Sequence, residues 1–519
     1  MPEVATAGPK HDRRLILAVL CVSLLLVSLD NTILNVALPV IVRTLHASSS
    51  SLQWIVDSYA IVFAGLLLVV GSLGDRVGRK WVFMGGLVIF AAGSALSAFS
   101  GSADRLIAAR AFMGVGGAAI MPCTLSILTN TFTEAHARAR AIGIWSGTTG
   151  LGVAIGPVAG GWLLAHFWWG SVFLVNVPIA LIGLTATAWI VPNSKNPHAK
   201  RADLIGAGLS IAGMGLLLWG IIEAPERSWT SPIVIGAIAA ALVILASFVY
   251  FERHSSHPML QTSFFKSRRL SVAMAAMALV MFALMGALFM ITQYLQFSLG
   301  YTPLETGLRI APIALVLLIG APLSSVIDRW IGTKPVVFTG LAFIAVGFAL
   351  LSRVTVHGSY LDMLPALVMM GMGTGFALAP STESVMGSLP ISQAGVGAAT
   401  NGAGLQTGGA LGVGVLGSLL NTRYMNRLSP VLARHPMPAS VLHLITGSLG
   451  GALAISKHIG GLLGSELAAL ARSAFVSGLD LAVTVGAIVV GVASIAVLVT
   501  LPNRGGPPAA DESAEDVAN

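Results

Sequence analysis

The strongest constraint on this chain is the recurrence, along most of its length, of apolar stretches about 20 residues long. A helix that rises 1.5 Å per residue needs about 20 residues to cross the hydrocarbon core of a bilayer. Only 10% of the 519 residues are charged, whereas a soluble domain carries roughly 25%. Because a backbone in lipid must satisfy its own hydrogen bonds, we predict an all-α integral membrane protein.

The apolar stretches predict fourteen membrane spans, near residues 15–39, 51–74, 81–100, 105–127, 139–164, 171–191, 203–222, 231–251, 270–298, 306–328, 335–353, 361–386, 394–421 and 478–501. We expect the following parts: a cytoplasmic tail at 1–14, a six-helix bundle at 15–191, two additional helices with linkers at 192–269, a second six-helix bundle at 270–501 that includes a long external loop at 422–477, and a disordered cytoplasmic tail at 502–519. Within that loop, the apolar spacing of 439–477 predicts short interfacial helices, with a re-entrant pair or an extra pair of spans as alternatives.

The orientation follows from the Lys and Arg residues, because short loops that are rich in them stay on the cytoplasmic side of the membrane. One set of alternate loops holds most of them: Lys10, Arg13, Arg14, Arg76, Arg79, Lys80, Arg138, Arg140, Lys195, Lys200, Arg201, Arg253, Lys266, Arg268, Arg269, Arg329, Lys334 and Arg504. The opposite short loops hold only Arg43, Arg105, Arg227, Arg309 and Arg353. Both termini are therefore predicted to be cytoplasmic, which agrees with an even number of spans.

The N-terminus has basic residues before an apolar stretch, as a secretory signal peptide does. That stretch is longer than the apolar core of a signal peptide and lacks a small-residue cleavage site, so we expect a retained first span. The two cysteines, Cys21 and Cys123, each lie in an apolar run, which favours buried thiols over a disulfide or a metal site.

The sequence gives little support for a nucleic-acid binder or an enzyme. The net charge of +8 could suit a nucleic-acid binder, but the basic residues are spread among loops. The sequence has neither the G-x-x-x-x-G-K-[ST] motif of nucleotide-driven pumps nor the H-E-x-x-H motif of zinc enzymes, and a G-x-G-x-x-A string at 114–119 lies inside a predicted span. We expect no enzyme activity, no nucleic acid, no metal and no cofactor.

Three ionisable residues lie inside predicted spans, where such groups are costly and therefore candidates for function. Asp30 lies about 22 Å from the cytoplasmic start of the first span, and Asp57 and Arg110 each lie about 9 Å below the outer surface. Desolvation favours the neutral form of a carboxyl group and a nearby cation favours the charged form, so an aspartate beside an arginine can exchange a proton near neutral pH. The alternatives are a static ion pair for Asp30 and Arg110, and an interfacial residue for Asp57.

Further polar residues are weaker candidates for substrate contact. Gln293 and Tyr294 in the ninth span offer polar and aromatic contacts to a cavity, or simple packing. Glu383 lies near the cytoplasmic end of its span, where it could admit a cation from inside or serve as an ordinary interfacial carboxylate.

Two glycine-containing segments also stand out. The cytoplasmic loop at 71–80 combines turn-forming glycines with charges that could latch against a neighbouring helix, namely Gly71, Asp75, Arg76, Gly78, Arg79 and Lys80. A fainter echo at 328–334 suggests two parallel halves. In the fifth span, a stripe of glycines with an adjacent proline predicts close helix packing and a bend: Gly152, Gly156, Pro157, Gly160 and Gly161.

Taken together, these motifs resemble those of the major facilitator superfamily, in its fourteen-helix drug:proton antiporter branch. The loop at 71–80 is similar to the signature loop of the superfamily, and the stretch 106–114 around Arg110 is similar to its proton-transfer motif, with Met113 where glutamine is usual. The segment 152–161 resembles the antiporter motif, and 29–39 resembles the first-helix motif, with Asp30 at the acidic position. The Trp54-x-x-Asp57-x-Tyr59 string is similar to the second helix of quaternary-ammonium exporters.

The resemblance implies two six-helix bundles with two extra central helices, and proton-coupled export of amphipathic, often cationic, small molecules across a bacterial-type cytoplasmic membrane. It implies Asp30 and Arg110 as the proton-coupling pair and Asp57 and Tyr59 as substrate contacts. The expected partners are protons, small-molecule substrates and membrane lipid, with the monomer as the working unit. The alternatives are a dedicated exporter of one endogenous metabolite, antibiotic or lipid, and a non-transporting sensor on a transporter fold.

Overall fold

The computed structural model of the chain describes residues 12–195, 203–255, 267–386, 394–434 and 437–502. All regular secondary structure in these ranges is helical, and fourteen helices in them are long and apolar enough to cross a membrane. The prediction of an all-α protein with fourteen spans is confirmed. Residues 1–11 of the predicted N-terminal tail, the basic residues Lys200, Arg201 and Lys266, and 503–519 of the predicted C-terminal tail lie outside the described residues.

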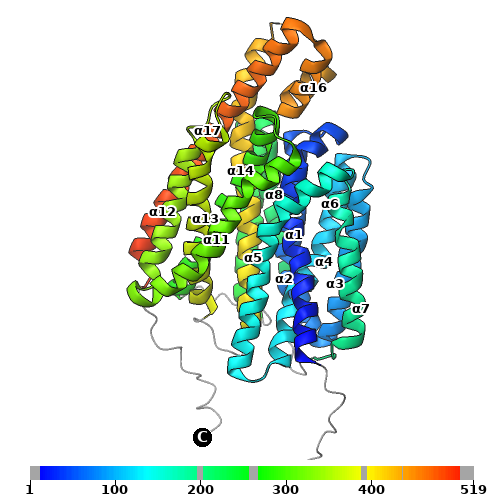
Figure 1. Ribbon diagram of the computed structural model, residues 1–519, viewed down its shortest axis with the longest axis vertical. Coiled ribbons are helices and arrows are strands. Elements are labelled where there is room, and N and C mark those ends of the chain that lie inside the picture. The colour runs from blue at the N-terminus through cyan, green and yellow to red at the C-terminus, as the bar shows by residue number, and fades with distance from the viewer. Residues whose placement is uncertain (1–11, 196–202, 256–266, 387–393, 435–436, 503–519) are drawn as a thin grey trace, which may run out of the picture.

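The first bundle contains six spans (Figure 1). They are α1 (Arg13–Leu45), α2 (Ser49–Val77), α3 (Arg79–Ala98), α4 (Ala103–Thr131), α5 (Ala135–His166), and the pair α6 (Ser171–Leu174) and α7 (Asn176–Ile190), which together form the sixth span. Serine side chains cap the starts of α2 and α4, because Ser48 and Ser102 accept hydrogen bonds from backbone N–H groups of the first turn.

The second bundle also contains six spans (Figure 1). They are α10 (Arg268–Gln293), which continues into the π-helical turn η2 (Tyr294–Ser298), then α11 (Pro303–Ile331), α12 (Thr333–Leu351), α13 (Tyr360–Met386), α14 (Ala394–Leu432) and α17 (Gly461–Thr500). A capping box between Thr302 and Glu305 starts α11.

Two additional helices separate the bundles in the sequence, α8 (Leu204–Arg227) and α9 (Pro232–His254). Helix α8 packs against both α2 and α14, one from each bundle, whereas α9 packs mainly against α8. The pair therefore lies at the periphery. It takes no part in the α5–α11 and α1–α10 contacts between the two bundles.

The two halves share one backbone device, as the echo between 75–80 and 328–334 suggested. Gly78 joins α2 to α3 with a φ of 129°, and Gly332 joins α11 to α12 with a φ of 89°. Residues that carry a side chain rarely adopt such positive φ angles, so glycine is required at both corners. A Cβ at Gly78 would also overlap the Asn193 side chain.

The segment 422–477, predicted as a long external loop, is largely helical. Helix α14 continues to Leu432 and α17 begins at Gly461, so both extend past the predicted ends at 421 and 478. Between them lie two short helices, α15 (Ala439–Gly447) and α16 (Leu449–Ile459), within the stretch where short helices were predicted. Tyr424 explains part of the extension, because its buried hydroxyl donates to the Ile445 carbonyl of α15 and gives the lengthened helix a packing partner. Figure 1 shows these elements projecting beyond the bundles at one end.

The surface of the spans is apolar, as lipid requires. On α17, the exposed side chains Ile488, Val492, Ile495 and Val499 recur at helical spacing and form one continuous apolar face.

The predicted orientation can be tested by cysteine accessibility. In a chain with Cys21 and Cys123 replaced by alanine, we expect Lys457→Cys in α16 to react with a membrane-impermeant maleimide in intact cells. Glu134→Cys, before α5 at the opposite end, should react only after permeabilisation, because the bilayer excludes the reagent. Both positions are exposed, so full labelling of each in permeabilised cells is the control. The reverse pattern in intact cells would refute the orientation.

Candidate functional site

The centre of the site is an ion pair buried between α1 and α4. Arg110 Nη1 lies 2.5 Å from Asp30 Oδ2, and each side chain is only 1% exposed. Sequence depth placed both residues in the outer half of the membrane, and the structure brings them into direct contact. Removing one partner from a buried pair of this kind leaves an uncompensated charge in a medium of low dielectric, which is strongly unfavourable.

Arg110 also holds α2 to the pair. Its Nε donates to the Ile55 carbonyl at 3.2 Å, and its guanidinium carbon lies 4.4 Å from the centroid of the Tyr59 ring. A cation over an aromatic face is attracted by the ring quadrupole. Tyr59, a predicted substrate contact, is fully buried here and acts as a wall of the ion-pair site.

Sequence reasoning missed a third member of this network, Asn176 at the start of α7. Its Nδ2 donates to Asp30 Oδ1 at 2.9 Å and to Ser94 Oγ at 3.1 Å, and Ser94 Oγ donates to the Phe173 carbonyl at 2.8 Å. Asn176 and Ser94 are both fully buried. A search for ionisable groups passes over a neutral amide. The signal that was available is a strongly polar side chain within the apolar stretch 171–191.

Asp57 has different neighbours, although it was predicted at the same depth. It lies on the side of α2 that faces α14, where one carboxylate oxygen would be 3.5 Å from a Cβ at Gly414. The side chain is fully buried, and neither oxygen has a hydrogen-bond partner. One turn before Asp57 on α2, Gln53 Nε2 donates to the Val413 and Gly414 carbonyls of α14 at 3.0 Å each. The carboxyl group is therefore held at a contact between the two bundles.

The glycine stripe of α5 contacts the part of α1 that carries Asp30. A Cβ at Gly156 would overlap the Thr32 side chain, and one at Gly152 would meet Ser28. Thr32 Oγ1 also donates to the Gly152 carbonyl at 3.2 Å. A Cβ at Gly160 would lie 3.1 Å from the Ile33 carbonyl oxygen. The stripe therefore brings α5 to backbone distance from the turn on each side of Asp30.

Another face of α5 contacts the second bundle. A Cβ at Gly161 would lie 2.6 Å from the Pro303 carbonyl oxygen, and a Cβ at Gly307 would overlap the Pro157 carbonyl. The predicted close packing of α5 thus serves two partners, α1 on one side and α11 on the other.

The segment 71–80, predicted as a cytoplasmic loop, is helical except at Gly78, because α2 continues to Val77 and α3 begins at Arg79. Its contacts lie within the first bundle. Arg79 Nε lies 2.7 Å from Asp75 Oδ1, and Arg79 Nη1 donates to the Ser126 carbonyl of α4 at 3.4 Å. Lys80 Nζ donates to the Ala188 carbonyl of α7 at 2.8 Å. Gly71 approaches Pro122, and Arg76 is exposed. The predicted latch is thus anchored to α4 and α7.

The remaining candidates are placed as follows. Gln293 is buried, and its amide donates to the Phe289 carbonyl of its own helix at 3.0 Å. The Tyr294 hydroxyl donates to the Thr355 carbonyl, between α12 and α13, at 2.7 Å. Glu383 is exposed near the end of α13. Among the hydrogen bonds of the described residues, none joins Gln293, Tyr294 or Glu383 to the ion-pair network.

The two bundles are joined at the end that is predicted to face outside. Besides the Gln53 contacts, Gln296 Nε2 of η2 donates to the Val36 carbonyl of α1 at 2.9 Å, and the Arg43 guanidinium carbon lies 5.1 Å from the Phe297 ring centroid. Helix α16 completes this closure, since a Cβ at Gly450 would touch both Val42 and Phe297. These contacts seal α1 of the first bundle against η2 of the second.

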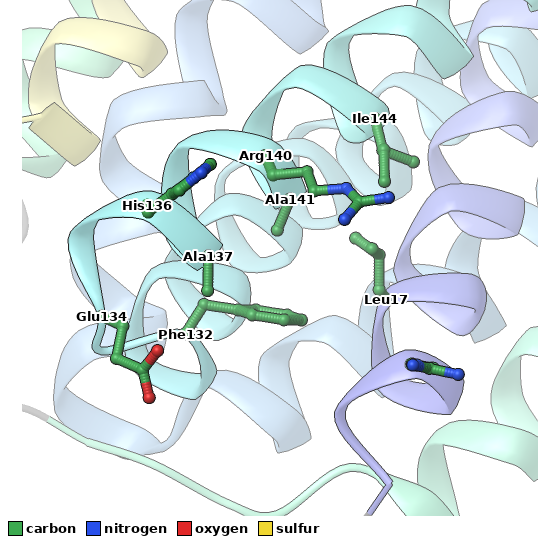
Figure 2. A pocket seen from close by; sticks show the side chains of 9 residues that line it. Leu17, Phe132, Glu134, His136, Ala137, Arg140, Ala141 and Ile144 are labelled. Atoms are coloured by element: carbon green, nitrogen blue, oxygen red, sulfur yellow. The ribbon is translucent and has the colours of Figure 1, made fainter.

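At the opposite end, a cavity of about 730 Å³ lies between the ends of α1, α4 and α5 that are predicted to be cytoplasmic. Figure 2 shows the Arg140 side chain extending toward Leu17, whereas the Glu134 carboxylate points away from it. Arg14 and His136 also line the cavity, so its walls carry more positive than negative groups. Such a lining does not suit a cation-binding site. Among the described residues, no group of three or more His, Cys, Asp or Glu side chains could hold a metal ion.

Comparison with known proteins relates this architecture to a protein family. A family model described as Major Facilitator Superfamily matches residues 20–413. The chain is 35% identical over 478 residues to the multidrug efflux pump LfrA of Mycolicibacterium smegmatis, covering 91% of this chain and 93% of that protein. It is 31% identical over 489 residues to the tetracenomycin C resistance and export protein of Streptomyces glaucescens, covering 93% of this chain and 91% of that protein.

A solved structure shares the fold. A bacterial homolog of the human lysosomal transporter Spinster, crystallised in an inward-facing and occupied conformation, matches with a TM-score of 0.66 at 16% sequence identity. The match covers 96% of this chain and all of that one, and at this identity it shows the fold alone. The family model spans most of the chain, and relatives above 30% identity align over nearly its full length. The chain therefore belongs to the Major Facilitator Superfamily.

Proposed function

We propose that this chain exports amphipathic, often cationic, small molecules across the cytoplasmic membrane in exchange for protons. The observation that carries the proposal is the Asp30–Arg110 ion pair, which is buried in one bundle and packed, through α5, against the other. The relatives named as multidrug efflux and resistance proteins support small molecules as substrates. Both bundles belong to one chain, so a monomer contains the complete site.

The packing of α5 supplies the coupling. Its glycines contact α1 on both sides of Asp30, and Gly161, near the C-terminal end of α5, contacts α11. Close-packed helices move as discrete units, because their interfaces do not deform continuously. A change in the position of α1 that follows a change of charge at Asp30 is therefore passed to the contact between the bundles.

The transport cycle follows from this arrangement. In the present structure the outer end is closed and Asp30 is paired with Arg110. Once the outer end opens, a proton from outside binds Asp30, cancels the attraction to Arg110 and drives substrate release. Closure of the outer end then lets the proton leave to the cytoplasm, where the segment 71–80 acts as the gate latch.

Asp57 is proposed to attract the positive charge of the substrate. Its carboxylate has no hydrogen-bond partner and lies at the α2–α14 contact, close to the Gln53 hydrogen bonds that seal the outer end. Separation of α2 and α14 on opening would expose this group, and a cation would then supply the missing partner.

A dedicated exporter of one compound is the second candidate, favoured by relatives named for single antibiotics, such as the puromycin resistance protein of Streptomyces alboniger at 32% identity. A substrate panel in proteoliposomes with a pH-sensitive dye separates the two functions. Proton release driven by many unrelated compounds supports the multidrug exporter, and release driven by one compound supports the dedicated exporter. Absence of proton flux with every compound would support a sensor.

Neutralising Asp30 should uncouple export from the proton gradient. We expect Asp30→Asn, at matched expression, to reduce uphill drug export by about tenfold or more, because the group that changes charge is lost. Asp104→Asn, an exposed acid in the first turn of α4, should export normally and serves as the control. Drug accumulation in energised cells is the measurement. Wild-type export by Asp30→Asn would exclude the coupling role.

Neutralising Asp57 should change substrate preference. We expect Asp57→Asn to reduce export of a monovalent cationic dye by roughly tenfold, since the electrostatic attraction is lost, and to affect an uncharged substrate far less. Initial export rates of the two compounds, measured in the same vesicles, give the comparison. An equal loss for both compounds would mean that Asp57 supports the fold or the gate and does not contact the cation.

Crowding the α1–α5 contact should block the conformational change. Gly156→Ala places a methyl group into Thr32, an overpacking that costs about 1–3 kcal/mol, so we expect export to fall by roughly tenfold with the protein still inserted. Gly143→Ala is the matched control, because nothing lies within 4 Å of a Cβ at that position on the same helix. Equal export by the two variants would argue against α5 as the coupling element.

A further inference from the structure

Only the Nδ2 end of the Asn176 side-chain amide makes hydrogen bonds. Its Nδ2 donates to Asp30 Oδ1 at 2.9 Å and to Ser94 Oγ at 3.1 Å. Its Oδ1 has no hydrogen-bond partner, although the side chain is completely buried. An unpaired buried acceptor costs about 1–3 kcal/mol, so an amide with a free acceptor beside the central carboxylate requires an explanation.

The chemistry of Asp30 provides one. A charged carboxylate only accepts hydrogen bonds, whereas a protonated carboxyl group also donates one. The Asn176 amide carries a donor and an acceptor at the two ends of one planar group, and rotation about its Cβ–Cγ bond exchanges them. Rotation moves Oδ1 to the position that faces Asp30 and moves Nδ2 to the position where Oδ1 now lacks a partner. The amide can therefore serve either charge state of Asp30 without leaving its place.

Ser94 fits both arrangements. Its hydroxyl now accepts from Asn176 and donates to the Phe173 carbonyl at 2.8 Å. After rotation of the amide, the same hydroxyl can turn and donate to Asn176 Oδ1, because a serine oxygen both donates and accepts. Asn176 thus keeps one hydrogen bond with Asp30 and one with Ser94 in both arrangements, and the Ser94 proton moves from the Phe173 carbonyl to Asn176.

We propose that Asn176 is a positioning residue whose amide reverses with the charge of Asp30, donating to the carboxylate and accepting from the protonated acid. The inference deepens the proposed function and rests on proton exchange at Asp30. Arg110 of α4 is the charged group that faces Asp30, and Tyr59 of α2 is the titratable group beside the pair. Asn176 keeps Asp30 oriented when protonation has weakened its bond to Arg110.

The first test is the pH profile of Asn176→Leu, which keeps the approximate volume but has no donor or acceptor. Charge-assisted hydrogen bonds are about twice as strong as neutral ones, so the variant loses more in the charged state than in the protonated state. We expect the pH midpoint of substrate binding by the purified protein to move upward by about one unit. Ser23→Ala, which removes a buried hydroxyl on α1 that donates to the Val19 carbonyl of its own helix, should keep the wild-type midpoint.

The outcomes separate the two proposals. If Asp30→Asn abolishes the pH dependence and Asn176→Leu binds with an unchanged midpoint, Asn176 has only a structural role and this inference fails while the proposed function stands. If Asp30→Asn leaves both pH dependence and export intact, the proposed function itself fails.

Infrared difference spectroscopy provides a second test that needs only folded wild-type protein. With asparagine carrying a ¹³C label in its side-chain carbonyl, acid-minus-alkaline spectra should show a shift of one amide band together with the Asp30 carboxyl band. The Asp30→Asn variant, equally labelled, should lose both changes. A carboxyl band that titrates with no accompanying change in any labelled amide would overturn the proposal.

Discussion

The low dielectric of the membrane interior is the constraint on which this structure depends. A charge placed there must have a partner, and Asp30 and Arg110 satisfy each other at 2.5 Å with almost no exposure. The remaining contacts of the pair come from three helices: the Ile55 carbonyl and the Tyr59 ring of α2, the Asn176 amide of α7 and, through Asn176, the Ser94 hydroxyl of α3. A group that must change charge during transport is therefore held in a network that also joins helices.

Close helix packing turns that network into a part of the transport machine. Between membrane helices there is little hydrophobic driving force, so small residues that permit backbone contact decide which helices adhere. Glycines of α5 contact α1 beside Asp30 on one face and α11 on another, and Gly307 of α11 meets Pro157 in return. A local electrostatic event and a global rearrangement of two bundles are thus connected through one helix.

Several features were predictable because they are local. Hydropathy identified fourteen spans, and the faint repeat between 75–80 and 328–334 corresponds to two corners that each need a glycine with positive φ, Gly78 and Gly332. Asp30, Asp57 and Arg110 stood out as charges within apolar stretches. The ends of α14 and α17 were misplaced, because their extensions beyond the membrane depend on contacts with α15 and α16, as the Tyr424–Ile445 hydrogen bond illustrates.

The sequence by itself determined that the chain is helical, how many times it crosses the bilayer and which charges it buries, since the cost of exposing backbone or charge to lipid applies to each segment alone. Only the tertiary structure decided the partners. Asp30 meets Arg110 from 80 positions away and Asn176 from 146 positions away, whereas Asp57 turns toward α14. These choices depend on how each helix is rotated about its axis, and that rotation is set by packing against neighbours distant in the chain.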